Sequence, residues 1–313
     1  MSINGLFMNE ELIKKRYKTL AVLFSMVFPG LGHLYVGKWK ISIFIPFTFV
    51  LLIGAFAWTG LILVNFGMML YVTILLLWYL GLMVWVFQLA RNQSGVSLNK
   101  SQRWYFYILY VLVWYFLFGI VNSYLVQNRA DVFGFESFHI PATSMAPTLI
   151  GNDFIMVDTW AYKNANPVVG DVVVFKYPRD KKVKYIKRII AKPGDHVAYY
   201  DKRLFINRKE IKREFVGDYD GESTEYEMEE YTEQLGDIFY NITHIPSRPG
   251  QDAEYIVPEN FYFVLGDSRD NSNDSRYWGM LDENLIHGKA KYIFFSISKS
   301  LGIRYDRFGQ IIH

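Results

Sequence analysis

The chain has 313 residues, of which 51% are hydrophobic and 18% aromatic, and this composition is too apolar for an ordinary soluble protein of its size. Residues 1–126 carry nine Lys/Arg and two acidic residues, for a net charge of +7, whereas residues 127–313 carry 24 basic and 28 acidic residues, for a net charge of −4. This division excludes nucleic acid as a partner, because a nucleic-acid-binding protein would carry the basic charge on its soluble part. Cysteine is absent, which excludes disulfide bonds, thiolate zinc sites and thiol catalysis.

The apolar residues predict a multi-span α-helical membrane domain over residues 1–126. Residues 41–90 contain no Asp, Glu, Lys or Arg, and this length accommodates two transmembrane helices, at about 41–64 and 67–90, with a turn at Asn65 to Gly67. A third uncharged span covers about 104–125. Buried helices of a soluble domain are the alternative, but they would need a large apolar partner layer that the acidic half does not supply.

The stretch 19–36 is also uncharged, but Pro29 to Gly32 interrupts it. Basic residues gather before it and in the short segments 37–40 and 91–103, and short basic loops stay in the cytoplasm. All three segments lie inside if 19–36 enters the membrane and returns, and residues 127–313 then lie outside. We therefore expect a re-entrant or broken segment; a full span with an external N-terminus is the alternative. Nothing here resembles a cleavable signal peptide.

Residues 127–313 predict a β-rich extracytoplasmic domain. Short β-type runs such as DFIMVDTW, DVVVFKY and FYFVLG alternate with turns that contain Gly-Asp pairs, and no amphipathic helix of normal length is visible. We expect antiparallel sheets that are coiled and partly barrel-like.

An acidic insertion interrupts this pattern at about 214–237. It contains ten acidic residues and no Lys or Arg, interleaved with tyrosines. We expect a solvated, mobile insertion; an acidic surface for a partner and a weak calcium site are the alternatives. The acidic residues lack the fixed spacing and the glycine of a calcium-binding loop, so we predict no metal.

Two runs hold a candidate nucleophile and a candidate base. Ser144 lies in HIPATSMAPTL, soon after the third apolar span, and Lys187 lies in KYIKRIIAKPGD. A lysine can deprotonate a serine only if burial lowers its pKa from about 10.4 toward 7 to 8. Strand alternation places Lys187 on the face of Ile189 and opposite Arg188. Taken alone, each run also suits a structural role. Ser144 could belong to a Pro-flanked turn, and Lys187 could be a lysine at the surface of a strand. A Ser/His/Asp triad is an alternative, although no histidine lies in a motif that ties it to a serine.

A third run is GDSRDNSNDSRYWGML at residues 266–281. Turn formation explains why Gly, Asp, Asn and Ser are frequent in it, but not the specific order of the whole string. The three runs together resemble the type I signal peptidases, the membrane-bound serine proteases that remove signal peptides. The resemblance covers about residues 130–300 and is carried, in the family's order, by SMAPTL, GDVVVFKYP, YIKRIIAKPGD and GDSRDNSNDSRYWG.

The resemblance implies a role for each matching residue. Ser144 would be the nucleophile, its backbone N–H helping to hold the oxyanion, and Lys187 the general base. Ser272 would orient the lysine ammonium. Asp274 and Arg276 would form a buried ion pair that shapes the site, with Asp267 and Arg269 as further structural members. The pockets for the small residues of an A-x-A-like cleavage site would be formed by Phe138, Ile140, Met145, Leu149, Tyr185 and Ile186.

Position 142 departs from one form of the family's pattern. Many Gram-negative members carry a serine two residues before the nucleophile, and its hydroxyl completes the oxyanion hole, whereas this chain has Ala142. Losing a side-chain donor costs roughly 10²- to 10³-fold in rate if nothing replaces it. Other members have glycine there, so a backbone or water donor is one expectation, and the hydroxyl of Thr143 is another. The several spans before Ser144 also exceed the usual one or two.

The resemblance thus implies a Ser/Lys endopeptidase of this family that cleaves the signal peptides of exported preproteins at the outer face of the bacterial inner membrane through an acyl-enzyme. We expect no metal or organic cofactor, and membrane lipid and the secretion machinery as further partners. A catalytically silent adaptor that binds preproteins and a Ser/Lys protease with a dedicated substrate are the alternatives.

Overall fold

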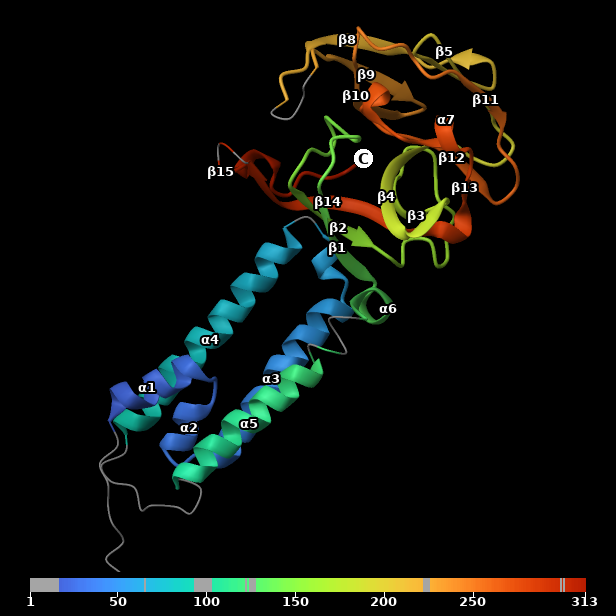
Figure 1. The fold of residues 1–313 in the computed structure, drawn as a ribbon. Helices are drawn as coiled ribbons and strands as arrows, with labels where there is room; N and C mark the ends of the chain where they lie inside the picture. The colour runs from blue at the N-terminus through green and yellow to red at the C-terminus, as the bar shows by residue number, and fades with distance from the viewer. Residues whose placement is uncertain are drawn as a thin grey trace, which may run out of the picture. The chain divides into compact units, whose positions relative to one another are not determined.

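The computed structural model describes residues 17–64, 66–92, 103–121, 123, 128–221, 226–298, 300 and 302–313. The chain divides into two compact units, one formed by residues 1–62 and 67–128 and the other by residues 129–313 with 63–66 (Figure 1). The expected turn residue Asn65, the basic residues of positions 14–16 and 100, and the end of the third expected span lie outside the described residues.

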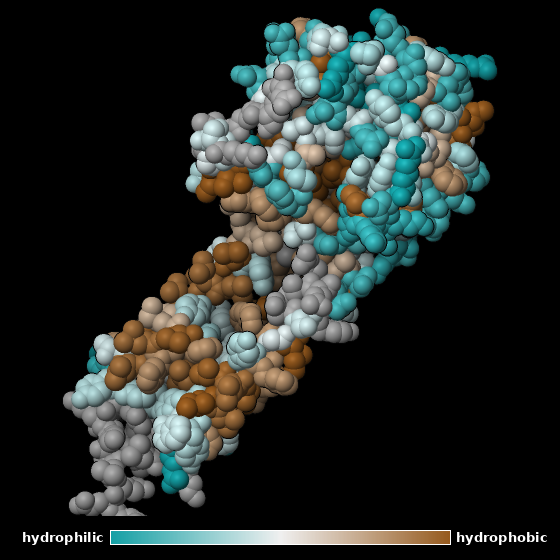
Figure 2. Space-filling view, in the orientation of Figure 1, coloured by the Kyte–Doolittle hydropathy of each residue, from teal (hydrophilic) through white to brown (hydrophobic). Residues whose placement is uncertain are grey.

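The first unit is helical. Its helices are α1 (Lys18–Val27), α2 (Leu31–Tyr35), α3 (Trp39–Trp58), α4 (Gly67–Arg91) and α5 (Trp104–Val121), with the short 3-10 helix η1 (Leu61–Leu63) after α3. Among the described helices, Trp39–Phe56 and Gly67–Arg91 are long and apolar enough to cross a membrane, while Trp104–Ile120 is apolar but shorter. Figure 2 shows apolar side chains over this unit. Exposed apolar residues of α3 include Leu51 and Trp58, which are 69% and 84% exposed. Such a surface suits lipid better than water.

The break between α1 and α2 falls at Pro29 and Gly30. The carbonyl oxygen of Pro29 accepts hydrogen bonds from Tyr110 Oη at 2.8 Å and from Trp114 Nε1 at 3.2 Å, while that of Gly30 accepts one from Ser42 Oγ at 2.8 Å. These donors belong to α5 and α3, so the neighbouring helices satisfy the carbonyl groups that the interrupted helix leaves free.

The second unit is built from antiparallel sheets. The largest has eight strands, in the order β1 (Phe135–Ile140), β2 (Asp153–Asp158), β14 (Ile286–Ser298), β3 (Val172–Tyr177), β4 (Asp180–Ala191), β12 (Phe261–Leu265) and β13 (Leu281–Asp282), with β15 (Gly302–Ile303) beside β14. This sheet is strongly curved, as shown by the salt bridge between Glu136 of β1 and Lys184 of β4, which lies four strands further along the order. It does not close into a barrel in the described part of the chain, since β1 pairs only with β2.

Two smaller sheets complete the unit. One contains β11 (Ala253–Ile256), β5 (His196–Tyr200), β6 (Arg203–Ile206) and β7 (Lys209–Glu210), and the other contains β10 (Ile238–His244), β9 (Glu229–Leu235) and β8 (Arg213–Asp218). The helices α6 (Arg129–Phe133) and α7 (Ser275–Trp278) are short, as the sequence predicted for this half.

The acidic segment 214–237 is not simply a solvated insertion, as the sequence suggested. Its described residues form β8 and β9, with 222–225 outside them. Leu235 packs in a hydrophobic cluster with Tyr240, and Glu233 is only 1% exposed. The charge count concealed this because it does not register that a strand can bury an acidic side chain on its inner face, as β9 does with Glu233.

Candidate active site

Ser144 lies in the turn that follows β1, and buried side chains later in the same turn hold it against the core. Met145 is 1% exposed and Leu149 is fully buried, both in a hydrophobic cluster with Ile155 of β2. The backbone N–H of Ser268 donates to the carbonyl oxygen of Ser144 at 3.2 Å. The nucleophile position is therefore set by the core below it and by the loop after β12.

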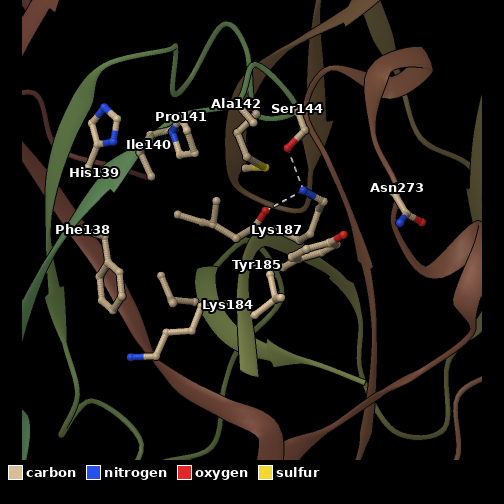
Figure 3. A pocket seen from close by; sticks show the side chains of 14 residues that line it. Phe138, His139, Ile140, Pro141, Ala142, Ser144, Lys184, Tyr185, Lys187 and Asn273 are labelled. Atoms are coloured by element: carbon tan, nitrogen blue, oxygen red, sulfur yellow. Dashed lines mark hydrogen bonds between the residues drawn. The ribbon is translucent and has the colours of Figure 1, made fainter. Parts of the chain in front are cut away.

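Lys187 extends from the middle of β4, where it is paired in register with Val173 of β3. Its Nζ lies 2.8 Å from Ser144 Oγ and donates to the carbonyl oxygen of Ile186 at 2.7 Å (Figure 3). The side chain is only 3% exposed. A serine and a lysine that are 43 residues apart in sequence thus meet at hydrogen-bond distance, the arrangement that a Ser/Lys dyad requires.

Burial tunes the lysine for this chemistry. Desolvation lowers the pKa of Lys187 from 10.5 to about 8, while Asp274 and Asp267 oppose this shift and Arg276 adds to it. About one tenth of the amine is therefore uncharged at pH 7, and only the uncharged amine can accept the proton of Ser144. The sequence analysis required a lysine pKa of about 7 to 8, reached by burial, and the pKa of Lys187 lies at the upper end of this range.

A cavity of about 360 Å³ opens beside the dyad. Five of the six side chains expected to form substrate pockets line it, namely Phe138, Ile140, Met145, Tyr185 and Ile186. Leu149 does not, which corrects the expectation, because it points into the core under the turn. Of the other lining residues, the sequence analysis considered only Ala142, for the oxyanion hole; the rest are His139, Pro141, Val174, Val183, Lys184 and Asn273.

The structure contains the expected ion pair behind the site and further pairs that the sequence analysis did not name. Asp274 and Arg276 form a buried pair with Nε–Oδ1 and Nη2–Oδ2 distances of 2.8 Å, as expected. Asp267, however, binds Arg188 in the same two-pronged way, at 2.9 and 2.7 Å. Arg188 lies on the opposite face of β4 from Lys187 and is fully buried. Its charge is tolerated there because Asp267 neutralises it.

Arg269, expected only as a further structural member of the site, binds Glu233 of β9. Arg269 Nη1 and Nη2 donate to the two carboxylate oxygens at 2.7 and 2.5 Å, and Tyr240 Oη donates to Glu233 at 2.7 Å. No sequence pattern indicated this partner, because the acidic surplus of segment 214–237 is typical of a solvent-exposed segment. Through this ion pair, the sheet of β8, β9 and β10 contacts the loop that carries Ser272 and Asp274.

Ser272 lies near the dyad without binding it. Its Oγ is buried and has no hydrogen-bond partner among the described residues, whereas the two contacts of Lys187 Nζ go to Ser144 and Ile186. Gly266 lies between the two serines, since a Cβ at this position would lie 2.2 Å from Ser272 Oγ and 2.4 Å from the carbonyl oxygen of Ser144. The sequence analysis assigned Gly266 only to a turn, and the structure makes it a point of close approach.

The oxyanion side of the cavity carries few side-chain donors. Ala142 lines the cavity next to Ser144. Thr143 is not part of the lining, and its Oγ1 accepts a hydrogen bond from Asn271 Nδ2 at 2.9 Å. The geometry therefore gives no support to Thr143 as the replacement donor. In the described part of the chain, the Ser144 amide donates to no acceptor, so it is available to bind an oxyanion.

Comparison with known proteins places the chain in a family. The family model of signal peptidase, peptidase S26, matches residues 108–295. The chain belongs to this signal peptidase family. The signal peptidase I of Pseudomonas fluorescens is 34% identical over 279 residues, which cover 74% of this chain and 92% of the relative. That of Aquifex aeolicus is 34% identical over 194 residues, covering 51% of this chain and 76% of the relative.

A solved structure of a signal peptidase I from Enterococcus faecalis covers 40% of this chain and 96% of its own, at 26% identity and a TM-score of 0.25. This score is too low to support a shared overall arrangement. Family membership therefore rests on the sequence comparisons, which identify a serine endopeptidase of the signal peptidase I type.

Proposed function

We propose that the chain removes N-terminal signal peptides from exported preproteins, with Ser144 as nucleophile and Lys187 as general base. The observation that carries this proposal is the 2.8 Å contact between Ser144 Oγ and a buried lysine, at the wall of a largely apolar cavity. The curated relatives named signal peptidase I support the substrate class.

The reaction follows from the positions of these groups. Uncharged Lys187 takes the hydroxyl proton as Ser144 Oγ attacks the scissile carbonyl carbon, and the resulting ammonium gives the proton to the departing amine. The product is an ester between Ser144 and the signal peptide. Lys187 then removes a proton from a water molecule that attacks this ester, which releases the peptide and restores the serine hydroxyl.

The carbonyl oxygen becomes negatively charged in both steps, and the free backbone amide of Ser144 supplies one donor to it. Ala142 contributes no side-chain donor, so the second position of the oxyanion hole is filled by backbone or water. Ser272, with its unpartnered buried hydroxyl, accepts a hydrogen bond from the Lys187 ammonium when the lysine turns from Ser144 after proton transfer.

The substrate binds as an extended strand. β1 has an unpaired edge among the described strands, and its side chains at Phe138 and Ile140 line the cavity, so a peptide added along this edge places alternate side chains in the cavity. The wall near Ser144 is formed by Met145 and Ile186, which accept a small side chain and exclude a bulky one by steric overlap.

We further propose a multi-pass protein of the bacterial inner membrane with the second unit on the extracytoplasmic face. The basic short segments of the first unit and its apolar surface support this orientation. Membrane lipid surrounds the first unit, and the extra helices before Ser144 offer a contact for the secretion machinery. Because the chain has no cysteine, labelling a Gly5→Cys variant from either side of sealed vesicles tests the orientation without a background. Labelling from the outside only would contradict an internal N-terminus.

Processing of a preprotein by the purified chain in detergent tests the catalytic assignment. Ser144→Ala and Lys187→Ala each abolish cleavage, whereas Lys182→Ala, an exposed lysine in the same hairpin, does not. Full activity of either dyad variant would overturn the assignment. Binding of preproteins without cleavage by the unaltered chain would favour the silent adaptor, and cleavage of only one among several unrelated preproteins would favour a dedicated protease.

A further inference from the structure

A second cavity, of about 390 Å³, lies in the first unit between α3 and α5. These two helices begin at the same end of the unit and run next to each other in Figure 1. The lining residues lie between Trp39 and Phe47 of α3 and between Phe106 and Leu117 of α5, together with Leu34 of α2. The cavity therefore starts at the first turns of both helices and follows them inward.

Three polar side chains of this lining are already bound to backbone groups. Ser42 Oγ donates to the carbonyl oxygen of Gly30 at 2.8 Å, while Tyr110 Oη and Trp114 Nε1 donate to that of Pro29 at 2.8 and 3.2 Å. These bonds hold the break between α1 and α2. They leave mostly hydrocarbon surface toward the cavity, which therefore suits an apolar occupant.

The size of the cavity decides between two kinds of apolar occupant. Its lining advances eleven residues along α5, from Phe106 to Leu117, which is about 16 Å at a rise of about 1.5 Å per residue. A volume of about 390 Å³ over this length gives a mean cross-section of about 24 Å². An α-helix with its side chains has a cross-section of at least about 80 Å², so a partner helix does not fit, whereas one hydrocarbon chain does.

The length of the cavity also matches one leaflet of a bilayer. The hydrocarbon core of a bilayer is about 30 Å thick, so one leaflet accounts for about 15 Å. The cavity extends about the same distance from the first turns of α3 and α5. It thus fits an acyl chain that enters from the headgroup region and ends near the middle of the bilayer.

Three exposed basic residues lie where the cavity begins. The N–H of Ser42 donates to the carbonyl oxygen of Lys38 at 3.1 Å, and that of Phe106 donates to the carbonyl oxygen of Arg103 at 3.0 Å. Each of these basic residues is therefore one helical turn before a lining residue and on the same face of its helix. Lys40 lies in the first turn of α3.

No acidic side chain in the described helices of the first unit offsets these charges, because the sequence has no Asp or Glu from residue 12 to residue 130. The positive ends of the α3 and α5 helix dipoles lie at the same place. The mouth of the cavity is therefore positive and its interior apolar. This combination complements a lipid with an anionic headgroup.

We propose that the cavity binds one anionic phospholipid, with an acyl chain between α3 and α5 and the phosphate on Lys38, Lys40 and Arg103. The site goes beyond the peptidase activity and does not depend on it; it rests only on the proposed location of the first unit in a bilayer. The bound chain packs against Ser42 and Tyr110, whose hydrogen bonds hold the break between α1 and α2, so the lipid stabilises this interrupted segment.

Native mass spectrometry of the full chain in detergent tests the proposal with phosphatidylglycerol and phosphatidylcholine that carry the same acyl chains. We expect phosphatidylglycerol to bind at least about tenfold more tightly, because each basic side chain near an anionic headgroup contributes about fivefold. A double variant of Lys40→Gln and Arg103→Gln should weaken its binding about thirtyfold. A control double variant of Lys18→Gln and Arg91→Gln removes the same charge from exposed ends of α1 and α4 outside the cavity, and it should change neither lipid.

A larger side chain tests whether the acyl chain occupies the cavity. Val113→Trp fills the cavity from α5 and should weaken the binding of both lipids about tenfold, whereas Leu77→Trp, at an exposed position of α4, should not. Unchanged lipid binding by Val113→Trp would assign the cavity to another occupant and overturn the proposal. Equal binding of the two lipids would also overturn it, as would a preference that both double variants retain or lower equally.

The measured quantity is bound lipid, so a chain that processes no preprotein would contradict the proposed peptidase function but not this site. The double variant at Lys40 and Arg103 changes only exposed side chains, which keeps the test decisive if Val113→Trp does not fold. An external N-terminus in the labelling experiment would move the site to the other leaflet without removing it.

Discussion

The pH dependence of cleavage tests the assigned role of Lys187 directly. Burial lowers the pKa of its amine to about 8. Since only the uncharged amine accepts the Ser144 proton, the reactive fraction is about one tenth at pH 7 and about nine tenths at pH 9. A lysine with an ordinary pKa would have a reactive fraction about 300-fold smaller at pH 7.

We therefore expect kcat/KM to rise tenfold per pH unit on the acidic side and to level off above a midpoint of about 8, where half of the lysine is uncharged. The measurement is peptide cleavage by the full chain in detergent between about pH 6 and pH 10, with protein stability checked at each end. A midpoint near pH 10 would show that the lysine is not desolvated in the active state. A rising limb near pH 6.5 that persists in Lys187→Met would assign the base to a histidine.

The same pKa has a consequence for stability. The amine of Lys187 has a pKa of about 8 in the folded chain and 10.5 when exposed, so the unfolded chain binds more protons between these values. The resulting destabilisation is complete below about pH 8 and disappears as the pH rises toward 10.5, and at about 1.4 kcal/mol per pH unit it reaches roughly 3 kcal/mol. Lys187→Met keeps the volume without the charge, so it should raise the melting temperature at pH 7 while abolishing cleavage. An unchanged or lower melting temperature would contradict the reasoning.

Three further substitutions probe the parts around the dyad. Gly266→Ala places a Cβ 2.2 Å from Ser272 Oγ, so the loop must shift and kcat should fall at least about 100-fold; a normal kcat would show that the close approach is unimportant. Glu233→Ala leaves the Arg269 guanidinium buried without its partner and should destabilise the chain by about 3–5 kcal/mol in thermal unfolding, with Glu233→Gln milder. Ala142→Ser adds a hydroxyl at the cavity wall and should raise kcat about tenfold by donating to the oxyanion, whereas Ala142→Gly should not.

The apolar character of the first unit and the β-rich character of the second followed from patterns that are local in sequence. A helix that lies in lipid needs a long uncharged run, and a strand needs only alternation over a few residues, so both are visible without knowledge of the neighbours. The expected spans at 41–64 and 67–90 correspond to α3 at Trp39–Trp58 and α4 at Gly67–Arg91, with differences of up to six residues at the ends. Helix ends depend on caps and neighbouring chain, which hydropathy does not register.

The ion pairs and the pocket lining were harder to predict from the sequence, because they depend on which strands become neighbours in the folded chain. The ion pair between Asp267 and Arg188 follows from the pairing of β4 with β12, and no spacing in the sequence encodes it. Glu233 belonged to an acidic segment whose composition indicated solvent, yet its position on the inner face of β9 makes it the partner of a buried arginine. Leu149 was assigned to the cavity by the family resemblance, but its side chain points into the core below the turn.

The sequence by itself determined the chemical class of this protein: three ordered runs carried Ser144, Lys187 and the loop at 266–281, and the charge division placed an apolar unit before them. Only the tertiary structure decided that the serine and the lysine lie 2.8 Å apart and that the lysine is buried enough to lose its proton near pH 8. The physical reason is that reactivity depends on distance and desolvation, and both arise from strands that are far apart in the chain but adjacent in the curved sheet.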